Sequence, residues 1–211
     1  HITQREVGSH TKSFPAALRA CFREDPDVIL VGEMRDRLTL NSALTASETG
    51  HLVLGTVHTA SADTTVDRII NAFPGDDQPQ VRSMLANNLR AICCQHLLKR
   101  KDAGRVLAVE VMLNNDAVAN LIRKGRTFQI PNVVATSRES GMESMDNALF
   151  RLVRTGAVDA ELGYMKCVNK KEFALRLSRE GIDDRYVEIA KGKSTSSFPA
   201  ASQTSKVSRT G

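Results

Sequence analysis

The 211-residue sequence contains no long apolar run. Its longest stretch of large aliphatic side chains covers residues 28–31, whereas a membrane-spanning helix needs about 20 apolar residues. Near the first residue there is no basic segment followed by an apolar one, the pattern typical of a secretory signal. We therefore expect no transmembrane segment and no signal peptide.

Paired cysteines are also lacking. Cys21, Cys93, Cys94 and Cys167 form no C-x-x-C pair, the spacing typical of zinc and thioredoxin-like redox sites. We expect reduced structural thiols, as in an intracellular protein.

The net charge is only +5, from 29 Lys and Arg against 24 Asp and Glu. Most of this excess lies in the Ser/Thr-rich residues 191–211, which predicts a disordered basic tail and no nucleic-acid partner.

Apolar runs and helical patterns alternate along the first half of the chain. Residues 28–31 and 51–57 predict strands buried on both faces, and residues 106–113 predict a third strand. Between them, Pro79 is placed to start a long helix that continues through Ile92 and His96. Strands that alternate with helices indicate an α/β domain with a mainly parallel sheet.

The pattern changes near Asn114, beyond which only helices are predicted. We therefore divide the chain into an α/β core at 1–114, a helical subdomain at 115–190 and the tail at 191–211.

Two predicted strands are followed by side chains capable of chemistry. Glu33 follows the first in the segment DPDVILVGEMRD (25–36), and His58 follows the second in ETGHLVLGTVHT (48–59). Ligands of open α/β sheets bind at these strand ends, so neighbouring strands would bring Glu33 and His58 to one crevice. There a carboxylate holds Mg²⁺ through water or orients an attacking water, and a histidine contacts phosphate. The alternatives are a solvated turn and structural histidines, a role that fits His51 better than His58.

These segments carry a resemblance to a known family. Residues 25–36 resemble the Walker B segment of the type II/type IV secretion ATPases, and residues 48–59 resemble their His box. Segments 4–8 and 67–74 fit the same family, and the PilT-type pilus retraction ATPases are especially similar over 4–173. The resemblance implies a RecA-like P-loop ATPase core in which Glu33 is the Walker B acid. It also implies further site residues: the γ-phosphate-linked histidine His58, with His51, Arg35 and Asp27 in support.

A later segment resembles the retraction motif AIRNLIR. Residues 117–123 read AVANLIR, with Ala119 where the motif has arginine. The resemblance assigns four residues to this motif: Asn120, Leu121, Ile122 and Arg123. Taken alone, the segment predicts only an amphipathic helix. The absence of the zinc-binding cysteine cluster typical of the assembly and type II secretion relatives favours retraction.

No G-x-x-x-x-G-K-[ST] phosphate loop occurs in the 211 residues. We therefore expect the C-terminal half of such an enzyme, inactive by itself. The resemblance implies a Mg²⁺-dependent, homohexameric ATPase that retracts type IV pilus fibres with an inner-membrane platform protein, at the cytoplasmic face of that membrane. The alternatives are a pilus assembly or type II secretion ATPase of the same superfamily, and a non-catalytic interaction protein that keeps the fold.

Overall fold

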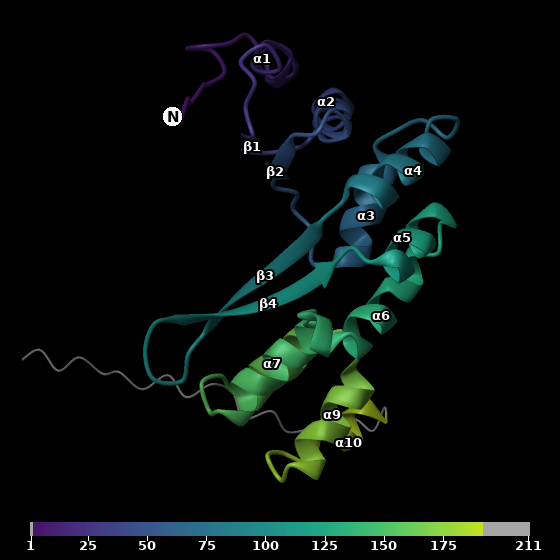
Figure 1. The fold of residues 1–211 in the computed structure, drawn as a ribbon. Helices are drawn as coiled ribbons and strands as arrows, with labels where there is room; N and C mark the ends of the chain where they lie inside the picture. The colour runs from purple at the N-terminus through teal and green to yellow at the C-terminus, as the bar shows by residue number, and fades with distance from the viewer. Residues whose placement is uncertain (1, 192–211) are drawn as a thin grey trace, which may run out of the picture.

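The computed structural model describes residues 2–191 (Figure 1). The predicted tail therefore lies almost wholly outside the described residues. The elements follow in the order α1 (Phe14–Cys21), β1 (Val28–Val31), α2 (Arg37–Glu48), β2 (Leu52–Gly55), α3 (Ala62–Asn71), α4 (Gln78–Asn88), β3 (Ala91–Lys99), β4 (Arg105–Leu113), α5 (Asp116–Arg123), the 3₁₀ helix η1 (Thr127–Gln129), α6 (Ile130–Thr136), the 3₁₀ helix η2 (Arg138–Ser140), α7 (Met145–Arg154), α8 (Ala160–Lys166), α9 (Lys170–Arg179) and α10 (Arg185–Ala190).

Strands β1 and β2 form a two-stranded parallel sheet, as predicted for neighbouring strands. One face is covered, because Ile29 and Val31 pack with Leu18 of α1. The other face is open: Val28 and Leu30 are 52% and 72% exposed. The prediction that both faces are buried is therefore wrong for the described residues, since this sheet has only two strands and only one face is covered.

Strands β3 and β4 form an antiparallel hairpin. The prediction that the helix from Pro79 continues through Ile92 and His96 is wrong, because α4 ends at Asn88 and both residues lie on β3. Leu89 is already extended, with ψ 132°. The spacing of Leu89, Ile92 and His96 fits a helix, but side chains alternate between buried and exposed along β3, which is the two-residue period of a strand.

One large hydrophobic core joins the hairpin to the helices on both sides of Asn114. It extends from Leu40 on α2 to Tyr186 on α10. Figure 1 shows β1, β2 and α1 at one end, the hairpin across the middle and α7, α9 and α10 at the other end. From Asn115 to the last described residue the regular elements are all helical, as the sequence predicts.

A buried carboxylate ties the hairpin to two helices. Glu110 on β4 is 9% exposed. Its Oε1 accepts a hydrogen bond from the backbone N–H of Ala62 at 2.8 Å, and its Oε2 accepts one from Met145 at 3.2 Å. These are the first residues of α3 and α7, whose N-terminal N–H groups have no partner within their own helices. One side chain therefore caps a helix on each side of Asn114.

Candidate functional site

The C-terminal ends of β1 and β2 place the two candidate catalytic residues side by side. The backbone N–H of Met34 donates to the carbonyl of Thr56 at 3.0 Å, and the Thr56 hydroxyl donates to the carbonyl of Gly32. These contacts extend the parallel pairing beyond the strands. The turn that carries Glu33 is thereby held against the segment that leads to His58.

Glu33 lies at the centre of a three-residue cluster. His58 Nε2 is 2.9 Å from Glu33 Oε1, and Arg35 Nε forms an ion pair with the same oxygen. The Glu33 side chain is 25% exposed and its Oε1 is shielded from solvent, whereas the side chains of Arg35 and His58 are about three-quarters exposed. The structure thus brings Glu33, His58 and Arg35 together, as the strand-end argument predicts for the first two.

The cluster keeps Glu33 ionised. The Arg35 guanidinium, which is ion-paired to Glu33, has the largest effect and lowers the pKa of the Glu33 carboxyl below its usual range. The nearby His58 adds to this effect, and desolvation opposes it. An ionised carboxylate beside a histidine at a strand end can accept a proton from a water molecule or orient that water. This chemistry suits hydrolysis of a bound phosphate ester or anhydride.

The carboxylate also fits a magnesium ion. Mg²⁺ prefers oxygen ligands and keeps several waters, so one or two protein carboxylates suffice when substrate phosphates complete its shell. Within residues 2–191 no group of three or more His, Cys, Asp or Glu side chains could hold a metal by itself. Glu33 therefore fits a water-mediated contact to an ion that arrives with phosphate.

Two predicted supporting residues, Asp27 and His51, lie at the N-terminal ends of β1 and β2, whereas Glu33 and His58 follow the C-terminal ends. Asp27 precedes β1, and its carbonyl accepts a hydrogen bond from the Leu52 N–H at 3.1 Å. His51 precedes β2, and its Nδ1 is 3.1 Å from the carbonyl of Ala46 near the end of α2. The described structure does not bring either residue to Glu33. For His51 the geometry matches the structural alternative.

The four residues of the retraction-type motif lie on α5, away from Glu33. Ile122 is fully buried and Leu121 is half-buried, while Asn120 and Arg123 are exposed. Arg123 Nη2 donates to Asn87 Oδ1 on α4 at 3.1 Å. Ala119 is only 6% exposed, so a small core side chain stands where the motif has arginine.

One contact of the site was not predicted. Arg68 on α3 donates from Nη1 to the carbonyl of His58 at 3.0 Å, which ties the segment after β2 to α3. The signal in the sequence was the Asp67–Arg68 pair in a segment that fits the family, but no role was assigned to Arg68. It is a positioning residue, because its contact is with the backbone of His58.

Comparison with known proteins identifies the family and the fold of the chain. The family described as "Type II/IV secretion system protein" matches residues 1–103. A "Twitching motility protein" of Neisseria gonorrhoeae is 49% identical over 174 residues, which are 82% of this chain and 46% of that protein. This chain belongs to the type II/IV secretion system protein family.

Two further matches lie within the pilus retraction branch of the family. The "Type IV pilus retractation ATPase PilT" of Pseudomonas aeruginosa is 46% identical over 160 residues, or 76% of this chain and 46% of that protein. A crystal structure of the pilus retraction motor PilT with bound ADP superposes with a TM-score of 0.74 at 45% identity, covering 81% of this chain and 48% of that one. The fold is therefore the C-terminal half of a RecA-like ATPase core with helices after it.

The chain spans about half the length of these relatives. No helix within residues 2–191 is long and apolar enough to cross a membrane.

Proposed function

We propose that this chain forms the hydrolytic side of the nucleotide site in an ATP-driven motor of type IV pilus retraction. The observation that carries the proposal is the meeting of Glu33 and His58 at the ends of two parallel strands, in a chain 46% identical to a pilus retraction ATPase. The strand ends are the place where open α/β sheets bind ligands.

In this proposal Glu33, His58 and Arg35 have separate tasks. Glu33, kept ionised by Arg35, orients the attacking water and accepts its proton. His58 donates a hydrogen bond from Nε2 to the terminal phosphate, exchanging its contact with Glu33 for one with substrate. Glu33 would hold Mg²⁺ through water, and the ion would neutralise part of the phosphate charge. Arg68 keeps the His58 backbone in position.

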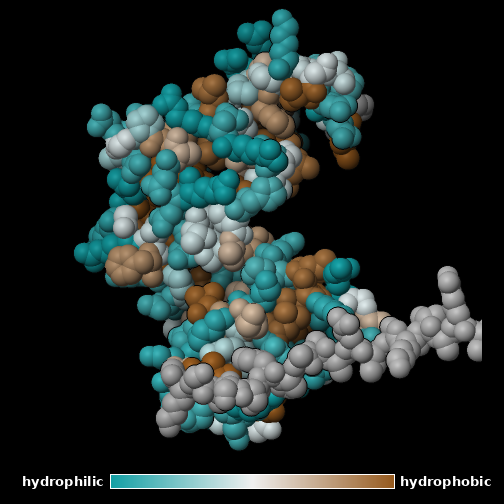
Figure 2. All heavy atoms as spheres, turned by 180° about the vertical axis from the view of Figure 1, so that it is seen from behind, coloured by the Kyte–Doolittle hydropathy of each residue, from teal (hydrophilic) through white to brown (hydrophobic). Residues whose placement is uncertain are grey.

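The remaining phosphate contacts are proposed to come from the half of the relatives that this chain does not span. The phosphate loop motif is not among the 211 residues, and its backbone N–H groups and lysine normally make the strongest contacts. The open face of the β1–β2 sheet, formed by Val28, Leu30, Leu52 and Leu54, is apolar enough to pack against further sheet or helix. Figure 2 shows exposed apolar atoms around a recess in the molecule, seen from behind. We accordingly propose that the 211 residues alone do not hydrolyse ATP.

The assembly and location are part of the same proposal. We infer a homohexamer that acts on an inner-membrane pilus platform protein from the cytoplasmic face of that membrane. The likeness to a pilus retraction motor structure supports these points. The proposed division into a core at 1–114 and a helical subdomain at 115–190 stays a prediction.

A complementation assay tests the proposed function. The full-length gene is expressed in a piliated bacterium that lacks its own retraction ATPase. We expect the wild-type protein to restore twitching and to reduce the excess of surface pili, because retraction removes pili. The same gene with Glu33→Gln should restore neither.

Three results would contradict the proposal. Restored pilus formation in a strain that lacks its assembly ATPase would indicate an assembly motor, and restored protein export would indicate a secretion ATPase. Full complementation by the Glu33→Gln variant would indicate an interaction protein that does not need hydrolysis.

A further inference from the structure

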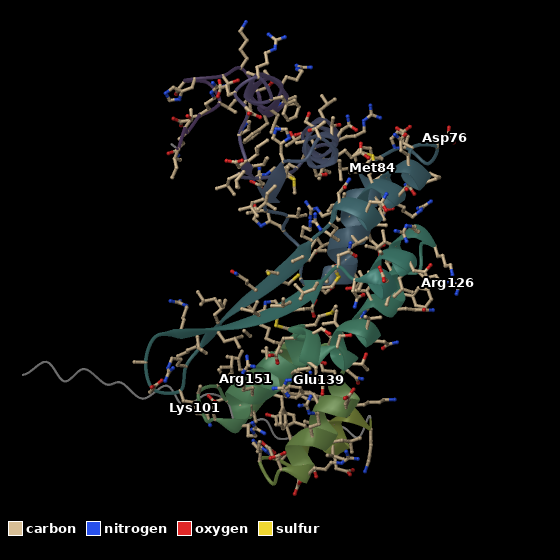
Figure 3. All side chains as sticks on the ribbon, viewed as in Figure 1. Asp76, Met84, Lys101, Arg126, Glu139 and Arg151 are labelled. Carbon is tan, nitrogen blue, oxygen red and sulfur yellow. The ribbon has the colours of Figure 1, made fainter. Side chains whose placement is uncertain are left out.

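Four arginines surround a small cleft between η2, α7 and α9. The cleft has a volume of about 50 Å³ and is lined by Arg138, Arg151, Arg154 and Arg176, with one acid, Glu143. A cavity needs at least roughly 10–15 Å³ of such space to hold one water molecule, so this cleft has room for a small polar group. Figure 3 labels Arg151 and Glu139 in the lower half of the molecule, and Glu139 is next to Arg138 in the sequence.

Two of the arginines are held in place by neighbouring side chains. The guanidinium carbon of Arg176 lies 4.1 Å from the centre of the Phe150 ring, and Nη1 of Arg176 donates to Asn147 Oδ1 at 2.7 Å. Arg151 Nη1 donates to Glu143 Oε2 at 2.7 Å. Each guanidinium has five N–H donors, so these contacts orient the two groups while leaving donors for a ligand.

The other two arginines have no such partner. Within residues 2–191, Arg138 and Arg154 have no hydrogen bond or ion pair from their side chains to another residue. The lining therefore carries four positive charges and one negative charge, a net charge of +3. An exposed acid, Glu139, adjoins Arg138 in the sequence but is not part of the lining.

Backbone pairing and aromatic packing hold the elements that carry the cleft. Glu143 exchanges two backbone hydrogen bonds with Val111 of β4, at 2.8 and 3.0 Å. Phe150 is buried and packs edge-on against Phe173 of α9, with ring centres 5.9 Å apart. Groups presented by packed elements lose little freedom when a ligand binds, which favours binding.

We propose that this cleft binds a phosphate-class oxyanion. Guanidinium groups match the oxygens of phosphate with paired, charge-assisted hydrogen bonds, and four of them can surround one tetrahedral group. The cleft is small, at about 50 Å³, so we expect it to take the anionic group while the rest of a larger ligand stays outside. The anion is either a soluble phosphate compound or the headgroup of an anionic phospholipid.

Titration with inorganic phosphate tests the site in the full 211-residue chain. Binding is followed by calorimetry and by the Nε–Hε resonances of arginine, at constant ionic strength set with chloride. The double variant Arg138→Gln/Arg154→Gln should bind phosphate at least about tenfold more weakly, because each lost guanidinium removes charge-assisted hydrogen bonds. Its melting temperature should stay within about 2 °C of the wild type, since both side chains are exposed.

A matched control separates the site from net charge. Arg19 on α1 and Arg126 before η1 are exposed, and Arg126 lies far from Arg151 in Figure 3. The double variant Arg19→Gln/Arg126→Gln removes the same charge and should bind phosphate like the wild type. Equal weakening in both double variants, or no saturable binding by the wild type, would overturn the proposal.

Vesicles distinguish the two sources of phosphate. Sedimentation is measured with phosphatidylcholine vesicles with and without phosphatidic acid. Binding that needs phosphatidic acid and is lost only in the Arg138→Gln/Arg154→Gln variant assigns a lipid headgroup to the cleft. Saturable binding of phosphate in solution without vesicle binding assigns a soluble phosphate compound. Absence of both kinds of binding would show that the cleft is not an anion site.

Discussion

Glutamine in place of Glu33 is expected to lower ATP hydrolysis by the full-length protein by roughly 100-fold or more, with ATP binding almost unchanged. Glutamine keeps the size of the side chain and one oxygen, but it cannot accept a proton and it carries no charge. Loss of a single preoriented electrostatic group in an active site typically costs this much in turnover. The measurement is the steady-state rate at saturating Mg-ATP, together with a nucleotide dissociation constant for each protein.

Glu48→Gln is the matched control. Glu48 ends α2, is exposed and lies before β2 rather than after it. Its substitution removes the same charge from the same part of the fold and should leave the rate within about twofold of the wild type. If Glu33→Gln hydrolyses ATP nearly as fast as Glu48→Gln, Glu33 has no part in the chemistry.

Truncation of Glu110 to alanine is expected to cost about 2–5 kcal/mol of stability. The change leaves the backbone N–H groups of Ala62 and Met145 without their acceptor inside the protein. Each unsatisfied buried donor costs roughly 1–3 kcal/mol, and the lost side chain leaves a cavity beside two helix ends. Chemical unfolding of the 211-residue chain measures the change in the free energy of unfolding.

Two comparisons isolate the role of the carboxylate. Glu48→Ala should change the free energy of unfolding by no more than about 0.5 kcal/mol, as expected for an exposed position.

Burial, reinforced by the charges of Asp63 and Asp146, raises the pKa of Glu110 in the folded chain. The folded state therefore binds a proton more tightly than the unfolded state. Consequently, the stability of the wild type relative to Glu110→Gln should fall as the pH rises through the Glu110 pKa. A difference that grows with pH would show that the folded environment favours the charged form.

The convergence of Glu33 and His58 could be predicted because it depends on local pattern and one general rule. The aliphatic run before Glu33 and the helix between the strands imply parallel neighbours, and parallel neighbours end at the same edge. Caps such as Ser13, whose hydroxyl accepts a hydrogen bond from the Ala16 N–H, are equally local. Such features need only a few consecutive residues.

The features that sequence reasoning missed depend on contacts between distant residues. The helix predicted from Pro79 extends into β3 because the spacing of Ile92 and His96 fits a helix, and only pairing with β4 selects the strand. Glu110 gives no sign in the sequence that it caps α3 and α7, since its partners are 48 and 35 residues away. The arginine cleft likewise joins Arg138 to Arg176 through packing of α7 on α9.

In the proposed function, Glu33 and His58 face the terminal phosphate of ATP. A structure of the full-length protein with Mg²⁺ and a non-hydrolysable ATP analogue tests it most directly. We expect His58 Nε2 within hydrogen-bond distance of a γ-phosphate oxygen, at about 2.7–3.2 Å. We expect a Glu33 oxygen at a similar distance from a water molecule that either binds the metal ion or lies in line with the γ-phosphate. A nucleotide bound with its γ-phosphate out of reach of both side chains would show that neither Glu33 nor His58 has the proposed role.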